Sequence, residues 1–241
     1  ALEKLNTSIS YNSGHTKAMN IKATVLLKLG KNDEAKALLD NIQKYDRLDM
    51  FSKYLLLNFG GNKDEFNEIF GEKCENYLDV AYDLINGGFY EKAIEVIDLS
   101  GKDYPLFDYV RAYCRGKLGD TAAEQRLLKS AEKQDTGYCF PARLDDIAVL
   151  ENAILKNKNG DNAYYYLGCL LYDRFAYEKA TKLWENCIAL NPNHSKAFRN
   201  LALSYFDKKG DLLSAKECME TALKNKPHDS RLIFEYQQIL R

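Results

Sequence analysis

The stretch that decides the fold runs from Asp161 to His194 and reads DNAYYYLGCLLYDRFAYEKATKLWENCIALNPNH. The order of residue types in its first half returns 34 residues later, because Tyr164 aligns with Phe198 (198 − 164 = 34). A fixed period of roughly 20 to 50 residues is the sequence signature of stacked structural repeats. The aligned residues that share this separation are Tyr164 with Phe198, Leu167 with Leu201, Gly168 with Ala202, and Leu171 with Tyr205.

The second half of the stretch returns as well, shifted by one further residue. Ala180 recurs as Ala215, a separation of 35 (215 − 180), so the extra residue falls in the intervening segment 208–211. Small residues such as Gly168 and Ala180 allow two helices to cross closely. Proline cannot donate a backbone hydrogen bond and disfavours helix at the preceding residue, so it ends the second helix. The recurring residues are Ala180 as Ala215, Trp184 as Met219, Cys187 as Ala222, and Pro192 as Pro227.

Degraded copies of the same skeleton precede the clear repeats. From Ala23 to Ala81 is 58 residues (81 − 23), ten fewer than two periods of 34, so we predict a shortened unit with helices in 49–60 and 63–71. The spacings within these copies match those of the clear repeat, which is why they are assigned to one skeleton. The two copies are Ala23, Leu26, Ala35 and Leu39, and Ala81, Leu84, Ala93 and Ile97.

A further copy, around Ala112, is atypical. It has Glu124 where the close-packing alanine should stand, so we expect its helix pair to splay or rotate. From Ala112 to Gly168 is 56 residues (168 − 112), again short of two periods. We therefore expect an irregular segment near 134–143, where Gly and Pro interrupt the helical pattern, followed by a single helix from Leu144 to Lys156.

The period and the order of residue types resemble the tetratricopeptide repeat, with an aromatic residue, Leu-Gly, Ala, a second aromatic residue and a final Pro. Cys187 replaces the second alanine of the pattern. The resemblance implies an all-α fold, a right-handed superhelical solenoid of antiparallel helix pairs with irregular central repeats and a C-terminal capping helix. We expect divergent repeats in 1–139, an irregular junction with a single helix in 140–160, two clear units in 161–229, and the capping helix in 230–241.

The composition limits the classes of partner that we expect the chain to bind. Lys and Arg total 34 against 35 for Asp and Glu, so a net charge of −1 supplies no field for nucleic acid or an anionic membrane. No apolar run reaches the ~20 residues of a membrane span. The six cysteines form no CxxC pair and are interpreted as buried, reduced thiols, which favours a cytoplasmic location. Because the chain opens with what reads as the middle or end of a helix, we expect a fragment of a larger protein.

Signals for catalysis are weak. The sequence has no Gly-rich phosphate loop, no HExxH and no GxSxG, and its three histidines do not have metal-ligand spacing. His194, near Cys187, is interpreted as a solvated turn residue beside a core thiol. We therefore expect no enzyme, no cofactor and no metal site.

The resemblance also places a candidate ligand surface. In such solenoids the first helices line a concave groove, so their outward residues are the candidate binding residues. Aromatic residues interleaved with Arg and Lys could clasp a peptide or a helix. Alternatively, Tyr165, Tyr172 and Phe206 pack against one another between repeats, and the sequence leaves both interpretations open. The candidates are Asn162, Tyr165, Cys169, Tyr172 and the neighbouring Asp173, then Lys196, Arg199, Leu203, Phe206 and the neighbouring Asp207.

A second resemblance concerns Phe140–Leu144, the helical segment after it and the clear repeats. They resemble the C-terminal repeat region of certain large bacterial proteins that carry an N-terminal β-sandwich domain similar to domains of carbohydrate-active enzymes. The leading hypothesis is a non-catalytic module for protein–protein interaction, whose partner is a protein, a peptide or another domain of the same chain. The alternative is a structural or dimerising appendage of a glycan-processing multidomain protein. The oligomeric state and the ligand stay open.

Overall fold

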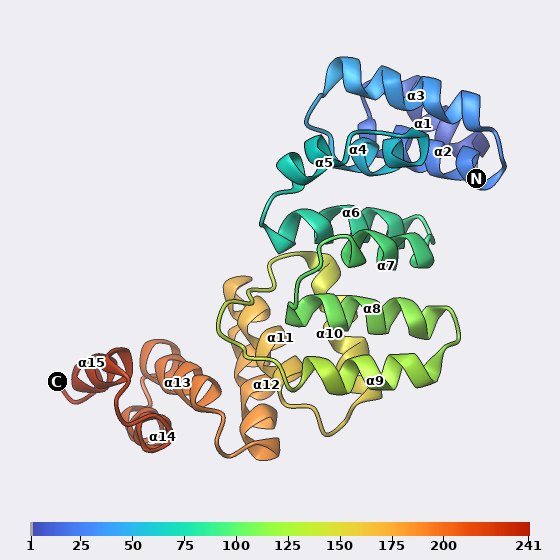
Figure 1. Ribbon diagram of the computed structural model, residues 1–241. Helices are drawn as coiled ribbons and strands as arrows, with labels where there is room; N and C mark the ends of the chain where they lie inside the picture. The colour runs from blue at the N-terminus through green and yellow to red at the C-terminus, as the bar shows by residue number, and fades with distance from the viewer. Residues whose placement is uncertain (1) are drawn as a thin grey trace. The chain divides into compact units, whose positions relative to one another are not determined.

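The computed structural model describes residues 2–241, and all regular secondary structure in that range is helical (Figure 1). The chain forms two compact units, an N-terminal unit that ends at Asp103 and a C-terminal unit, Tyr104–Arg241. In each unit, successive helices pack as antiparallel hairpins. The predicted all-α, helical-repeat fold class is thus confirmed. No described helix combines the length and apolar character that a bilayer span requires.

The N-terminal unit contains two hairpins of ordinary length and one short hairpin between them in the chain. The predicted shortened unit is confirmed, because α4 and α5 have only 7 and 8 residues. The described elements are α1 (Leu2–Tyr11), α2 (Thr16–Lys28), α3 (Asn32–Tyr45), α4 (Met50–Leu56), the 3-10 turn η1 (Leu57–Phe59), α5 (Lys63–Phe70), α6 (Cys74–Asn86) and α7 (Tyr90–Asp98).

The C-terminal unit contains the clear repeats. Its π-helical turn, η2, lies where the sequence placed the extra residue, because an inserted residue is absorbed most simply as one wider helical turn. The elements are α8 (Pro105–Lys117), α9 (Thr121–Ala131), α10 (Leu144–Lys156), α11 (Asn162–Asp173), α12 (Tyr177–Leu190), α13 (Ser195–Ser204), η2 (Tyr205–Lys209), α14 (Leu212–Asn225) and α15 (Ser230–Ile239).

Close helix crossings explain the small residues of the pattern. A Cβ atom on Gly168 would overlap the indole of Trp184, whose side chain is 2 % exposed. The indole Nε1 donates a hydrogen bond to the Tyr165 carbonyl oxygen at 3.2 Å. Ala180, beside this crossing, is fully buried. The α11–α12 hairpin is therefore filled to contact by its own residues.

The atypical copy does not splay as expected. Glu124 is 2 % exposed, and a Cβ atom on the facing Gly116 of α8 would lie 2.5 Å from its carboxylate. Asn152 of α10 donates a hydrogen bond to Glu124 Oε1 at 3.2 Å. α8 and α9 pack as extensively as α11 and α12. The prediction was wrong because the small residue has moved to the opposite helix, where Gly116 makes room for the carboxylate.

Candidate functional site

The predicted binding residues lie on α11, on α13 and in the π-helical turn after α13. Of the α11 residues, Asn162 is buried at the start of the helix. Its backbone N–H donates to Glu132 Oε2 at 2.7 Å, and its side-chain amide donates to the Glu132 carbonyl oxygen at 3.0 Å. Asn162 thus ties α11 to the end of α9.

Tyr165 and Cys169 are half-buried between α11 and α13. The Tyr165 ring lies 4.7 Å from the ring of His194, and Asn200 Nδ2 donates to Cys169 Sγ at 3.4 Å. Burial raises the pKa of the Cys169 thiol to about 11, so this cysteine stays protonated near neutral pH. It is not a ready nucleophile.

Tyr172 lies at the other end of α11. Its ring is 5.3 Å from the Trp184 ring and 4.8 Å from the Tyr177 ring, both on α12. Phe206 was expected on a regular first helix, but it lies in the π-helical turn η2. Phe206 and Leu203 pack at the edge of the core between α13, α14 and α15. The aromatic candidates thus have packing partners, and each keeps part of its surface exposed.

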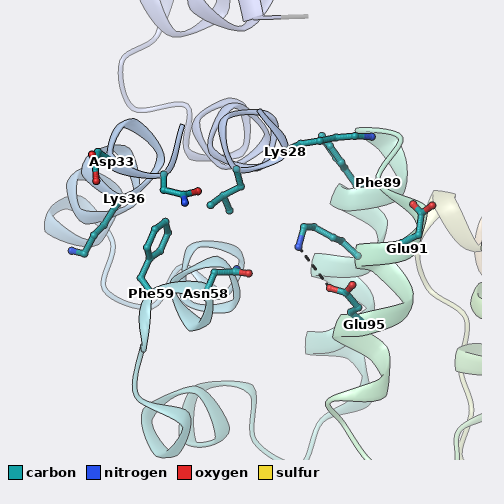
Figure 2. A pocket seen from close by; sticks show the side chains of 11 residues that line it. Lys28, Asp33, Lys36, Asn58, Phe59, Phe89, Glu91 and Glu95 are labelled. Atoms are coloured by element: carbon teal, nitrogen blue, oxygen red, sulfur yellow. Dashed lines mark ion pairs between the residues drawn. The ribbon is translucent and has the colours of Figure 1, made fainter. Parts of the chain in front are cut away.

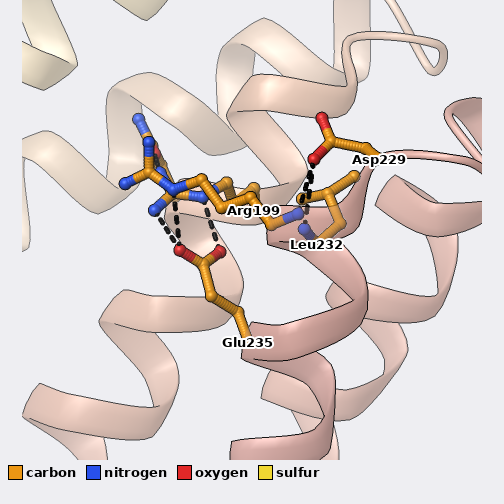
Figure 3. Close-up of polar contacts among 6 residues, drawn as sticks. Arg199, Asp229, Leu232 and Glu235 are labelled. Carbon is orange, nitrogen blue, oxygen red and sulfur yellow. Dashed lines mark hydrogen bonds and ion pairs between the residues drawn. The ribbon is translucent and has the colours of Figure 1, made fainter.

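The two basic candidates on α13 both make ion pairs. Lys196 Nζ lies 3.0 Å from Thr136 Oγ1 and 3.5 Å from Asp135, in the irregular segment after α9. Arg199 forms a bidentate pair with Glu235 of α15 at 2.6 and 2.5 Å, as Figure 3 shows. Bidentate Arg–carboxylate pairs are geometrically specific. Arg199 therefore joins α13 to α15.

Two arginine side chains contact the carboxylate of Glu235. Arg231 of the same helix donates to it at 3.0 Å, and the α15 helix is capped by Asp229, which accepts from the backbone of Arg231 and Leu232 (Figure 3). Burial alone would raise the pKa of Glu235, but the hydrogen bonds from the two arginines hold it below its usual range. The carboxylate is charged at neutral pH and holds Arg199 in place.

One cluster was not expected from the sequence. Asp161, Cys187 and His194 offer ligand atoms that lie within 4.8 Å of one another. His194, interpreted from the sequence as a solvated turn residue, is 8 % exposed, and its Nδ1 accepts the backbone N–H of Ala197 as the cap of α13. The sequence signal for this role was the position of His194 directly before α13, where a side chain can cap the helix.

The three groups of this cluster are protonated or hydrogen-bonded within the chain. Because Nδ1 of His194 accepts a hydrogen bond, the neutral ring carries its proton on Nε2 and presents a donor there. Burial lowers the pKa of His194 and raises that of the Cys187 thiol, so both groups are neutral at pH 7. Asp161 already accepts from the Asn191 amide at 2.8 Å. The arrangement stabilises a helix junction.

A pocket of about 720 Å³ lies within the N-terminal unit and was also missed by the sequence analysis. Figure 2 shows Phe59 and Asn58 on one side and Phe89, Glu91 and Glu95 on another. A volume of this size falls in the usual range for ligand pockets. The lining residues are Leu27, Lys28, Asn32, Asp33, Lys36, Asn58, Phe59, Phe89, Glu91, Lys92 and Glu95.

Among solved structures, the chain is similar to YrrB, a tetratricopeptide repeat protein with an unusual peptide-binding site, at 17% identity and a TM-score of 0.37 over 99% of this chain and 100% of that one. It is also similar to a thermophilic tetratricopeptide repeat protein of Thermus thermophilus, at 19% identity and a TM-score of 0.38 over 90% and 95% of the two chains. Likeness this distant transfers no residue roles. The family model of the tetratricopeptide repeat matches residues 161–194, so the clearest repeat of the chain is of tetratricopeptide type.

Proposed function

We propose that this chain is a non-catalytic interaction module that binds a protein or peptide on the outward residues of α11 and α13. The observation that supports this is the row of partly exposed Tyr165, Tyr172 and Phe206 interleaved with Lys196 and Arg199. Tyrosine and arginine give large contact areas and dominate the energetics of many interfaces. Their internal partners hold these side chains in fixed positions, which lowers the entropy lost on binding.

Arg199 needs a careful test, because it also joins α13 to α15. A peptide array is first screened with the full chain to find a peptide that binds. That peptide is the probe, and its affinity is then measured for each variant of the chain. We expect Arg199→Gln and Tyr165→Ala to weaken binding by at least about tenfold, the loss of one central contact. The matched control is Glu235→Gln, which breaks the same ion pair but keeps the guanidinium of Arg199.

The pattern across these variants decides the proposal. Retained binding in Glu235→Gln with loss in Arg199→Gln means that the guanidinium itself contacts the probe. Equal losses in both variants indicate that only the position of α15 matters. Lys182→Glu on α12 is a second control, since Lys182 is exposed on the other helix of the repeat. Full binding in both Arg199→Gln and Tyr165→Ala removes this surface as the site.

An alternative function is a structural or dimerising appendage of a larger bacterial, glycan-processing protein. The observation in its favour is the irregular segment that carries the second resemblance, where Tyr138, Phe140 and Leu144 are 91, 68 and 70 % exposed. Large exposed apolar side chains close together mark contact surfaces. The complete reading frame tests this alternative, which fails if no further domain is encoded. A cytoplasmic location is part of the main proposal, and the six free cysteines fit it.

A further inference from the structure

The pocket in the N-terminal unit lies beside the short α4–α5 hairpin. Its lining comes from α2, α3, η1, α7 and the turn before α7, and no residue of α5 contributes. In the full-length hairpins a second helix of 9 to 14 residues covers the first. Here the second helix, α5, has 8 residues and contributes no residue to the lining, and the pocket lies between α3, η1 and α7 (Figure 2).

Two aromatic rings are among the residues that line this pocket. Phe59 ends η1 and is only half-buried, and Phe89 lies in the turn before α7, also half-buried. The Lys28 ammonium lies 5.9 Å from the centre of the Phe89 ring. A cation at this distance from an aromatic face is attracted by it, so Lys28 already occupies one face of the ring.

Some charged residues at the rim of the pocket make ion pairs and others do not. Lys36 pairs with Asp40 at 2.8 Å, and Lys92 pairs with Glu95 at 3.7 Å. Glu95 also accepts from the Tyr54 hydroxyl at 3.2 Å. These contacts occupy two of the three lysines of the lining.

Two carboxylates of the rim remain available. Within residues 2–241, neither Asp33 nor Glu91 makes an ion pair or a side-chain hydrogen bond, and both are exposed. Figure 2 shows them on opposite sides of the pocket, Asp33 on α3 and Glu91 on α7. The lining thus combines two half-buried aromatic rings with an unpaired carboxylate at either side.

We propose that this pocket binds a segment of a partner protein in which apolar side chains are flanked by basic residues. The apolar side chains lie against Phe59 and Phe89, and the flanking cations face Asp33 and Glu91. This site shares no residue with the surface on α11 and α13, so each proposal stands or fails by itself.

The probe is a blocked, fluorescein-labelled peptide, Gly-Arg-Leu-Phe-Arg-Gly, titrated with the full chain and followed by anisotropy. The double variant Asp33→Asn with Glu91→Gln should weaken binding roughly three- to tenfold, as expected for two partly exposed charge pairs. Added salt should weaken the wild type in the same direction. The matched control, Glu68→Gln, removes an exposed carboxylate of α5 outside the pocket and should leave the affinity unchanged.

A second variant tests the location without touching the carboxylates. Asn32 is exposed and lines the pocket, so Asn32→Trp should block it and abolish binding of the peptide. The acidic counterpart, Gly-Glu-Leu-Phe-Glu-Gly, should bind at least about tenfold more weakly than the basic probe.

Several results would overturn the proposal. These are equal affinity for the basic and acidic peptides, no effect of either variant, or no binding of the basic peptide up to about 1 mM. Sedimentation of the chain alone covers one further occupant. A dimer that Asn32→Trp dissociates would show that a second copy of this chain fills the pocket, and the basic partner would be excluded.

Discussion

The α11–α12 hairpin and the short α4–α5 hairpin differ in the lengths of both helices, 12 and 14 residues against 7 and 8. In the first, α12 has 14 residues and places Trp184 directly on Gly168, so no space remains. In the second, α5 has 8 residues, and a pocket of about 720 Å³ opens beside η1. We therefore expect the short hairpin to be less well sealed than the α11–α12 hairpin.

The largest expected effect sharpens this contrast. Trp184→Ala should cost about 3–5 kcal/mol of unfolding free energy, since it empties a filled crossing and removes the bond to the Tyr165 carbonyl. Phe59→Ala, at the open pocket, should cost roughly 1–2 kcal/mol, because the ring is only half-buried. Urea unfolding followed by circular dichroism measures both. Equal losses would mean that the two hairpins are equally packed.

A smaller effect comes from adding one methyl group. Gly168→Ala should destabilise the chain by about 1–3 kcal/mol, because the new Cβ would overlap the Trp184 indole. In an open helix the same change is favourable, since Ala has the higher helix propensity. The same unfolding assay applies. A stabilised Gly168→Ala variant would show that the crossing is looser than the structure has it.

The ion pair between α13 and α15 predicts a pH dependence. The pKa of Glu235 is lowered in the folded state, so its stabilisation is complete above the ordinary value of 4.5 and is lost as the pH falls through the folded value. Glu235→Gln should cost about 1–2 kcal/mol at pH 7, as for a charge-assisted hydrogen bond. Below pH 4.5 the difference between the variant and the wild type should shrink. A constant difference from pH 7 to pH 3 would contradict this assignment.

The smallest effect concerns a hairpin turn. In four hairpin turns, the residue five positions before the close-packing residue of the second helix is a glycine with a positive φ. In the α11–α12 turn that position is Phe175, with a φ of 63°. A left-handed conformation costs a bulky residue roughly 1 kcal/mol, so Phe175→Gly should raise stability by up to about that amount. Gly210→Ala, in the next turn, is the matched change in the opposite sense. Thermal unfolding of both variants checks the pair, and a destabilised Phe175→Gly would show that the exposed ring contributes packing.

Sequence spacing predicted the hairpins well, because helix crossings require small residues at fixed separations. The 58-residue interval between Ala23 and Ala81 predicted the short unit but not its pocket. Where α5 would lie depends on contacts between residues far apart in the chain, which no local pattern encodes. The sequence also did not predict that Gly116, on the opposite helix, makes room for the Glu124 side chain, and the reason is the same.

The candidate surface was predicted only as a set of positions. The family resemblance placed Arg199 on the outward face of its helix, but its partner Glu235 lies 36 residues away on a helix whose rotation the sequence does not fix. Likewise, the burial of His194 follows from the ring of Tyr165 beside it and from the cap that it supplies to α13. Whether these side chains also bind a ligand stays a prediction.

Amide hydrogen exchange of the unmodified chain, read peptide by peptide, tests most directly whether the short hairpin is less well sealed than the α11–α12 hairpin. Amides of α11 and α12 should exchange slowly and together, whereas those of α4, η1 and α5 should exchange markedly faster through local opening. Protection of the short hairpin equal to that of α11 and α12 would contradict the account.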